Sequence, residues 1–294
     1  MSDKTRRLRT ALAWMALLAA ASPFLLPADA SGQDTSSSAL ATDTSRTASS
    51  SRQYISRREM IFGGVAVVAT GLLAPLDRPI QRNLQAEDLQ DDRGLRRTAN
   101  ALGFSGGPGP FIAGGAMYFV GLGMSSPRLA ALGVHLTEGV VVAAALNGLV
   151  KGLSGRELPN ATSGKPGHFS FGRGFHDDNG PFVSFPSGHT AASFAAAAVL
   201  TDEVSSWDST KARVVGPIAY SSATLVALSR LYSNVHWASD LPLGAAIGVL
   251  SGKGVVLWEQ RHPSNWLDRH LVGLTIAPAG RGMVLAGSIP LGMR

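Results

Sequence analysis

From residue 60 onward, the chain alternates apolar segments with short polar ones. The apolar segments are 60–76, 110–124, 129–150, 190–200, 214–228 and 241–257. Their length, and their content of Ala, Leu and Gly in place of alternating β-branched residues, favours helices over strands. Between the first two lies 80–102, an amphipathic and heavily charged stretch that we expect on a surface. The economical interpretation is an all-α fold in which six helices form one bundle.

The pattern changes after Pro263. Two short apolar stretches, 271–276 and 283–289, flank the glycine-rich sequence 277–282, which is typical of two strands joined by a turn. We therefore expect residues 263–294 to be a C-terminal extension with a small β-hairpin, packed on a helical domain of residues 58–262.

Residues 1–30 have the pattern of an export signal. A cationic start precedes an apolar run over 11–26 and the small-residue cleavage site Ala28-Asp29-Ala30. The alternative is an uncleaved membrane helix, but this run is short for a span of roughly 20 residues. Residues 31–57 hold nine Ser and four Thr and indicate a disordered linker, because so few apolar groups cannot offset the chain entropy.

Composition narrows the possible classes of protein. Hydrophobic residues make up 45 % of the chain and charged residues 16 %, which excludes a wholly disordered chain or a coiled coil. The absence of cysteine excludes disulfides, zinc–thiolate sites and thiol catalysis. The net charge of +6 sits largely in N-terminal runs and one central loop, so it does not by itself indicate a nucleic-acid partner. Short glycine-rich helices around a polar site favour a membrane protein, and a water-soluble bundle is the alternative.

Three polar clusters lie at the ends of the apolar segments. They are the segment 151–159 (KGLSGRELP), the segment 186–190 (PSGHT), and the series Ser229, Arg230, His236 and Asp240. Each cluster alone has an ordinary explanation, such as compensation of a helix dipole by Lys151 or helix capping by Ser187. Their convergence on neighbouring helix ends of one bundle indicates a shared site.

The chemistry that uses such a set is phosphoryl transfer. A phosphate ester is a dianion whose charge spreads over three oxygens in the transition state, so fixed cations and N–H donors stabilise it. The cations come from three side chains, Lys151, Arg156 and Arg230. The N–H donors lie at the start of the fourth helix, at Ser187, Gly188 and His189.

Two histidines divide the covalent steps between them. His236 serves as nucleophile if a carboxylate fixes its second ring nitrogen, and Asp240 lies about one helical turn away to do so. His189 is left as the general acid that protonates the leaving alkoxide, and then as the base that activates water against a phosphohistidine. We expect no metal and no other cofactor, because the cations already supply the electrostatic stabilisation.

These three clusters resemble the signature of the type 2 phosphatidic acid phosphatase and vanadium haloperoxidase superfamily. The family pattern runs lysine, six residues, Arg-Pro; then Pro-Ser-Gly-His; then Ser-Arg, five residues, His, three residues, Asp. The second and third motifs are complete here, and the resemblance covers about residues 110–258. It implies an all-helical fold and metal-independent phosphomonoesterase chemistry. It also implies the roles given above for His236, Asp240, His189, Lys151, Arg230, Ser187 and Gly188.

The first motif departs from the family pattern, because Leu158 stands where the family has arginine. We expect Arg156, two residues earlier, to bind phosphate in its place. The alternatives are that Lys165 or Arg173 of the following loop does so, or that the site is one donor short. Losing one such donor costs roughly 3 kcal/mol, or about a hundredfold in rate.

The loop over 154–185 contains six glycines, two histidines (His168 and His176) and Asp177-Asp178. No tight or helical spacing supports a metal site there. A flexible glycine-rich lid over the substrate is the favoured interpretation.

The sequence therefore predicts a metal-independent phosphatase that acts on a phosphomonoester or diphosphate, and on a lipid phosphate if the helices lie in a bilayer. We expect an exported protein of the cell membrane, with its site facing the periplasm or the exterior. The alternatives are a soluble exported acid phosphatase of broad specificity, a vanadate-dependent haloperoxidase, and a non-catalytic relative whose site has decayed.

Overall fold

The structure is a computed structural model, and it describes residues 56–176, 180–263, 265–272, 274–279 and 282–287. The predicted export signal and nearly all of the predicted linker lie outside these residues, as do Asp177 and Asp178 of the long loop. The expectations about those segments stay predictions.

Helices make up most of the described chain, as the apolar pattern predicts. In chain order they are α2 (Arg57–Leu73), η2 (Ala74–Leu76), α3 (Asp77–Leu84), α4 (Glu87–Gln90), α5 (Arg93–Gly106), α6 (Gly109–Gly123), α7 (Pro127–Ser154), η3 (Arg173–Phe175), α8 (Gly188–Trp207), α9 (Ser209–Tyr232), α10 (Asp240–Arg261) and η4 (Asp268–Val272). The predicted all-α fold is confirmed, and the charged stretch after α2 forms the three helices α3, α4 and α5.

A small antiparallel hairpin follows the helices. Its strands are β1 (Leu274–Ala279) and β2 (Gly282–Gly287), paired from Leu274 with Gly287 to Ala279 with Gly282. The first strand begins three residues later than predicted, because the chain first forms the π-helical turn η4. The strands therefore include residues 277–279 and 282, which the sequence analysis assigns to the turn.

Local sequence determines where the helices that carry the site begin and end. α2 begins after Ser56, whose N–H donates to Glu59 Oε2 at 2.6 Å while the Glu59 N–H donates to Ser56 Oγ at 3.3 Å. This reciprocal pair is a capping box. α7 ends at Gly155, whose φ of +53° lies in the left-handed region. A Cβ at this position would overlap the carbonyl oxygen of Ser170, so only glycine lets the chain leave α7 and continue directly into Arg156.

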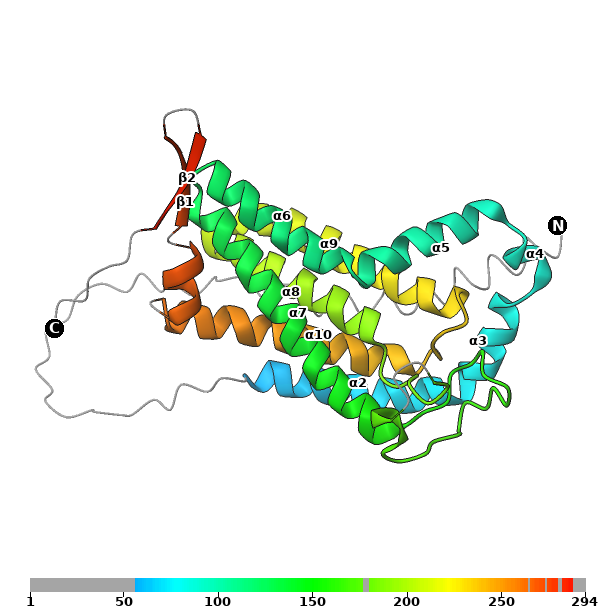
Figure 1. The fold of residues 1–294 in the computed structure, drawn as a ribbon. Coiled ribbons are helices and arrows are strands. Elements are labelled where there is room, and N and C mark those ends of the chain that lie inside the picture. The colour runs from blue at the N-terminus through cyan, green and yellow to red at the C-terminus, as the bar shows by residue number, and fades with distance from the viewer. Residues whose placement is uncertain (1–55, 177–179, 264, 273, 280–281, 288–294) are drawn as a thin grey trace, which may run out of the picture.

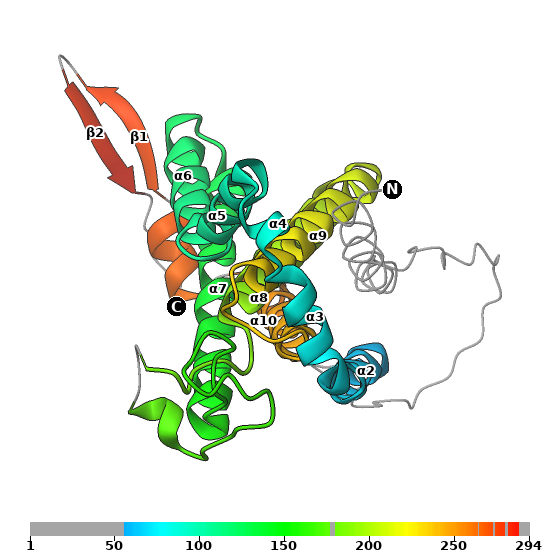
Figure 2. The ribbon, with the colours of Figure 1, turned by 90° about the vertical axis from the view of Figure 1, so that its right-hand side faces the viewer.

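α8 is the central helix of the bundle and packs on α7, α9 and α10 (Figures 1 and 2). One apolar cluster joins α8 to α9 and includes Phe194 and Tyr220, and another joins it to α7 and includes Val140 and Val199. α10 approaches α8 closely through Gly248, where a Cβ would lie 2.9 Å from the backbone nitrogen of Ala195. Small residues at such a contact are typical of helix packing in membranes.

The outer surface of the bundle is apolar. Four helical segments are long and apolar enough to cross a membrane by length and composition, namely residues 57–84, α7, α9 and α10. Their large apolar side chains include Leu72, Val141 and Ile218, all of which are exposed. Soluble monomers rarely expose contiguous apolar surface on this scale. The chain is a membrane protein by these features.

The three polar clusters lie at the same end of the bundle. That end holds the C-termini of α7 and α9 and the N-termini of α8 and α10. In Figure 1, α3 and the long loop after α7 lie there, and the β1–β2 hairpin lies at the opposite end. The fold therefore concentrates the candidate site residues where the membrane-type helices begin and end.

Candidate active site

His236 and Asp240 face each other at the turn between α9 and α10. His236 Nδ1 lies 3.4 Å from Asp240 Oδ2, which is too long for a well-formed hydrogen bond, and Nδ1 makes no hydrogen bond. Asp240 Oδ2 accepts instead from Ser184 Oγ at 2.6 Å and from the Trp237 N–H at 2.8 Å. The carboxylate is fully buried at the first position of α10, where the helix dipole favours its negative charge. Because Nδ1 faces this carboxylate, Nε2 is the nitrogen of His236 directed away from it.

Burial determines the protonation of His236. Loss of solvation lowers the pKa of its imidazole, and the charge of Lys151 lowers the pKa further. Asp240 opposes this shift because its carboxylate favours the protonated ring, but the net direction is downward. The ring is therefore neutral at neutral pH, which is the state that a nucleophilic imidazole requires.

His189 lies in the first turn of α8, where three other candidate residues act on it. Burial lowers its pKa to about 4, and the charges of Arg230, His236 and Lys151 contribute in the same direction. Electrostatic effects of this kind require proximity, so residues from α7, α8, α9 and the turn before α10 come together here. Nε2 of His189 faces the junction of α5 and α6, since a Cβ at Gly107 would lie 3.2 Å from that atom.

Arg230 is held between its own helix and α5. Its Nε donates to Ser229 Oγ at 3.2 Å, and NH2 donates to the carbonyl oxygen of Ala99 at 3.3 Å. α5 passes this guanidinium at Gly103, where a Cβ would lie 2.8 Å from Arg230 Cζ and would overlap NH2. The serine of the Ser-Arg pair thus orients the arginine, and α5 forms a wall against it.

The start of α8 is built as the sequence predicts, with one difference. Ser187 is the N-cap, and its Oγ accepts from the Thr190 N–H at 3.4 Å. Its own N–H donates to the Asp240 carbonyl at 3.1 Å and so is not free for an anion. The N–H groups of Gly188 and His189 remain, because the first residues of a helix have no intrahelical acceptor.

Lys151 lies in the last turn of α7 and is half-buried. Its Nζ donates to the carbonyl oxygen of Val183 at 2.5 Å, so the ammonium group is held beside the loop segment that leads into α8. The charge of Lys151 reaches both His189 and His236.

Arg156 does not take the geometry expected of a phosphate ligand. Its guanidinium is buried and forms ion pairs with Asp240 Oδ1 at 2.5 Å and with Asp77 Oδ2 at 2.6 Å. The alternative Arg173 stacks on the ring of Phe182 at 4.0 Å. In the structure two carboxylates hold the charge of Arg156, and direct binding of phosphate by Arg156 stays a prediction.

The long loop is held by contacts within itself and to the turn before α10. Within the loop, a bridge pairs Arg156 with Phe169, and His168 Nδ1 lies 2.8 Å from Glu157 Oε2. Trp237 Nε1 donates to the Glu157 carbonyl at 2.8 Å. Hydrogen bonds from Ser163 and His168 lower the pKa of Glu157 against the opposing effect of burial. The described part of the loop therefore docks at the site end through its first residues.

A group that could hold a metal lies far from these residues. Ligand atoms of His135, Glu138 and Glu259 lie within 4.8 Å of one another. The His135 ring already contacts Glu203 at 2.6 Å and Asp268 at 3.3 Å. His135 precedes Lys151 on α7 by a distance of about 24 Å at the rise of an α-helix. This group therefore lies outside the candidate active site.

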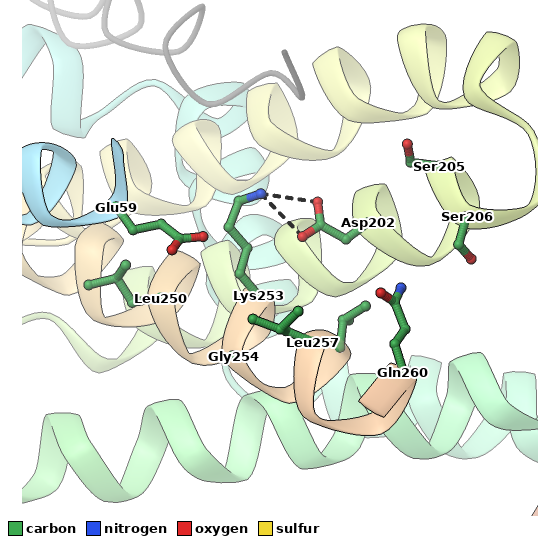
Figure 3. A pocket seen from close by; sticks show the side chains of 10 residues that line it. Glu59, Asp202, Ser205, Ser206, Leu250, Lys253, Gly254, Leu257 and Gln260 are labelled. Atoms are coloured by element: carbon green, nitrogen blue, oxygen red, sulfur yellow. Dashed lines mark hydrogen bonds and ion pairs between the residues drawn. The ribbon is translucent and has the colours of Figure 1, made fainter. Parts of the chain in front are cut away.

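A polar pocket also lies away from the motifs. It has a volume of about 520 Å³ and opens between α2, α8 and α10 (Figure 3). Lys253 and Asp202 point toward each other inside it, and their nearest atoms are 3.1 Å apart. Lys253 follows Asp240 on α10 by about 20 Å at the helical rise. The ion pair explains how a lysine is accommodated in an apolar helix.

Sequence reasoning missed several residues that organise the site, among them Asp77, Ala99, Gly103 and Ser184. Asp77 is 1 % exposed although it begins a charged stretch that looks like surface. Its partner Arg156 lies 79 residues away, and no local pattern indicates that pairing.

Residues 132–264 match the model of the PAP2 superfamily. The matched region contains α8, α9, α10, most of α7 and every complete motif, so the helices that carry the candidate site are similar to this superfamily. Asp77 and the whole of α5 lie before it.

Two known proteins show similarity to the chain. The lipid A 1-phosphatase of Porphyromonas gingivalis (strain ATCC 33277) is 42 % identical over 90 residues, which are 30 % of this chain and 18 % of that protein. The similarity thus spans less than a fifth of that relative. A crystal structure described as the first transmembrane PAP2 type phosphatidylglycerolphosphate phosphatase from Bacillus subtilis matches with a TM-score of 0.46 and 18 % identity. The match covers 69 % of this chain and 94 % of that one.

Proposed function

We propose that this chain is a phosphatase that hydrolyses a lipid phosphate through a covalent phosphohistidine. The observation that carries the proposal is that His236 faces Asp240 while Gly103 and Gly107, at the end of α5, lie against Arg230 and His189, all at one end of the bundle. The match of residues 132–264 to the PAP2 superfamily model supports it, as does similarity to a protein named as a lipid A 1-phosphatase.

In the first step, Nε2 of His236 attacks phosphorus and the bond from phosphorus to the ester oxygen breaks. His189, in its protonated form, donates a proton to the leaving alkoxide. Asp240 beside Nδ1 stabilises the positive charge that His236 acquires as its bond to phosphorus forms. The long contact in the free protein shortens as this charge develops.

In the second step, water attacks the phosphorus of phosphohistidine. His189, now neutral, accepts a proton from that water, and the bond between phosphorus and His236 breaks to release inorganic phosphate. His189 is protonated again at the end, so the cycle returns to its starting state.

Charge stabilisation comes from groups that are fixed before the substrate binds. The transferring phosphoryl group carries its charge on three oxygens, and we assign Lys151, Arg230 and the N–H groups of Gly188 and His189 to them. Arg230 is oriented by Ser229 and Ala99, and Lys151 by Val183. Because these cations supply the stabilisation, we expect turnover without a metal ion.

A lipid substrate follows from where the site lies. The polar residues gather at one end of helices whose outer faces are apolar. In a bilayer this end lies at the level of the headgroups, where a lipid phosphate presents its charge while its chains stay in the hydrocarbon. We further propose that the predicted export signal places this end on the periplasmic or outer side of the membrane.

The test is phosphate release by the full chain purified in detergent, in the presence of a chelator. The substrates are phosphatidic acid, an isoprenoid diphosphate and a water-soluble phosphate ester. We expect release from the lipids, loss of release in His236→Ala, and full activity in the control His262→Ala, whose ring is exposed and contacts Trp258. Unchanged activity in His236→Ala would contradict the mechanism.

A second measurement follows the intermediate. With a radiolabelled ester whose leaving group departs without a proton, such as 4-nitrophenyl phosphate, only the second step still requires His189. His189→Ala should then accumulate a labelled protein that is stable to alkali and labile to acid, as phosphohistidine is. Preference for the water-soluble ester would favour the soluble acid phosphatase. Halide oxidation that depends on vanadate and peroxide would favour the haloperoxidase instead.

A further inference from the structure

Arg156 is a buried arginine whose donors all point to other groups of the protein. NH1 donates to Asp240 Oδ1 at 2.5 Å and to Ser239 Oγ at 2.7 Å. NH2 donates to Asp77 Oδ2 at 2.6 Å and to the Pro166 carbonyl at 2.7 Å, and Nε donates to the same carbonyl at 2.9 Å. A guanidinium has five N–H groups, and these contacts engage all three of its nitrogens. Contact with a substrate phosphate would therefore require one of them to break.

Asp77 completes this network from a distant part of the chain. It is the first residue of α3 and is 1 % exposed. Its Oδ1 accepts from the Ser239 N–H at 2.9 Å, and its Oδ2 accepts from Ser239 Oγ at 2.7 Å. Asp77 thus holds both Arg156 and the residue directly before Asp240. It lies outside the region that matches the PAP2 superfamily.

The charges of the network favour chemistry at His236. Two carboxylates, Asp77 and Asp240, share the single positive charge of Arg156, so the three together carry a net charge of −1. If Asp77 were neutral, Arg156 would cancel the charge of Asp240, and His236 would lose the field that stabilises its positive form.

We propose that Arg156 and Asp77 are positioning residues for the His236–Asp240 pair, and this inference rests on the proposed phosphatase function. Arg156 fixes the rotamer of Asp240 through Oδ1, which leaves Oδ2 turned toward His236. Asp77 fixes Arg156 and returns the negative charge that Arg156 would otherwise neutralise. Arg156, two residues before the departure from the family pattern at Leu158, thus supports the nucleophile and not the phosphate.

The first test replaces Asp77 by asparagine, which keeps the shape and removes the charge. We expect Asp77→Asn to lower kcat about tenfold or more, as loss of a residue that orients a functional histidine does. KM should change less than twofold, because no phosphate contact is lost. The control is Asp91→Asn, which removes an exposed acid close by in the chain and should behave as the parent.

The pH profile of Asp77→Asn distinguishes a positioning role from a purely structural one, because loss of a purely structural residue would leave the profile unchanged. The groups that act on His236 are Asp240 from α10, Lys151 from α7 and His189 from α8. With these unchanged, removal of a negative charge lowers the pKa of His236. The acid limb of kcat/KM, which reports loss of the neutral nucleophile, should therefore move to lower pH.

The second test separates positioning from phosphate binding. Arg156→Lys keeps the charge and loses the fork that joins two carboxylates. We expect a lower kcat with unchanged inhibition by inorganic phosphate, whereas Arg230→Lys should weaken that inhibition. If Arg156→Lys weakens phosphate inhibition as much as Arg230→Lys does, Arg156 is a phosphate ligand and the inference is wrong.

The outcomes keep this inference apart from the proposed function. Absence of phosphate release by the parent protein overturns the function itself. An active parent together with Asp77→Asn of unchanged kcat and pH profile overturns only the positioning role. If Asp77→Asn fails to fold, as judged by thermal unfolding in detergent, Arg156→Lys and its phosphate inhibition decide the question.

Discussion

Replacing Gly103 by alanine tests whether Arg230 is the cation that the reaction uses. Gly103 lies on α5, and a Cβ there would stand 2.8 Å from Arg230 Cζ and overlap NH2. Carbon atoms in contact prefer about 3.5–4.0 Å, so the guanidinium has to withdraw by about 1 Å. The Ala99 carbonyl that holds NH2 lies on the same helix, so the hydrogen bond between them also breaks.

The magnitude follows from what a shift of this size does to a fixed donor. A displacement of about 1 Å at an oriented group costs about a hundredfold in rate. Loss of one oxyanion donor costs about 10²–10³-fold, or roughly 3–4 kcal/mol in the transition state. We therefore expect Gly103→Ala to lower kcat/KM about 100-fold. Alanine is a better helix former than glycine, so α5 itself should not be weakened.

The assay measures phosphate release at substrate concentrations well below KM, with thermal unfolding in detergent as the check on folding. The matched control is Gly115→Ala on α6, where a Cβ would have no atom within 4 Å. Parental kcat/KM in Gly103→Ala, with the fold intact, would refute the reasoning. It would mean that the Arg230 guanidinium does not contact α5 during turnover.

Three further predictions concern protonation, metals and the end of α7. Burial and neighbouring cations lower the pKa of His189 to about 4 in the free protein, so the alkaline limb of kcat/KM should lie in the acid range. A bound phosphate dianion offsets the charge of the cations, so the alkaline limb of kcat should lie at higher pH than that of kcat/KM. If the two alkaline limbs coincide in a rate–pH profile, His189 is not the general acid. Chelator should leave phosphate release unchanged after exhaustive dialysis, and restoration of lost activity by one added divalent cation would show a metal requirement. Gly155→Ala forces alanine into a left-handed conformation at a cost of about 1–2 kcal/mol, and its Cβ also overlaps Ser170. Thermal unfolding of this variant should show a lower midpoint than that of the control Gly148→Ala, where a Cβ has open space.

Apolar periodicity predicts the helices well and their ends less well. The segment 110–124 corresponds closely to α6, because glycine and proline punctuate it. The segment 190–200 is seven residues shorter than α8 at its C-terminal end. The apolar pattern stops at Asp202 and Glu203, yet the helix continues because these carboxylates pair with Lys253 and with His135. Tertiary partners of this kind have no signal in the local sequence.

For the candidate site too, the sequence indicates the residues of local motifs but not their distant partners. Motif spacing selects His189, His236 and Asp240 as candidates, because residues at helix ends with fixed separations are visible in the sequence, and the structure places His236 beside Asp240. It does not identify Asp77, whose role depends on burial against a residue far along the chain. It also does not indicate that two buried carboxylates pair with the guanidinium of Arg156.

The contact between Asp77 and Ser239 joins positions 162 residues apart. During biosynthesis, the early helices enter the bilayer long before the turn that carries His236 is translated. A nascent chain that ends before residue 236 lacks both the proposed nucleophile His236 and Asp240, although Asp77 has already been synthesised. Under the proposed mechanism, the site is therefore completed late, when the turn before α10 docks against Asp77.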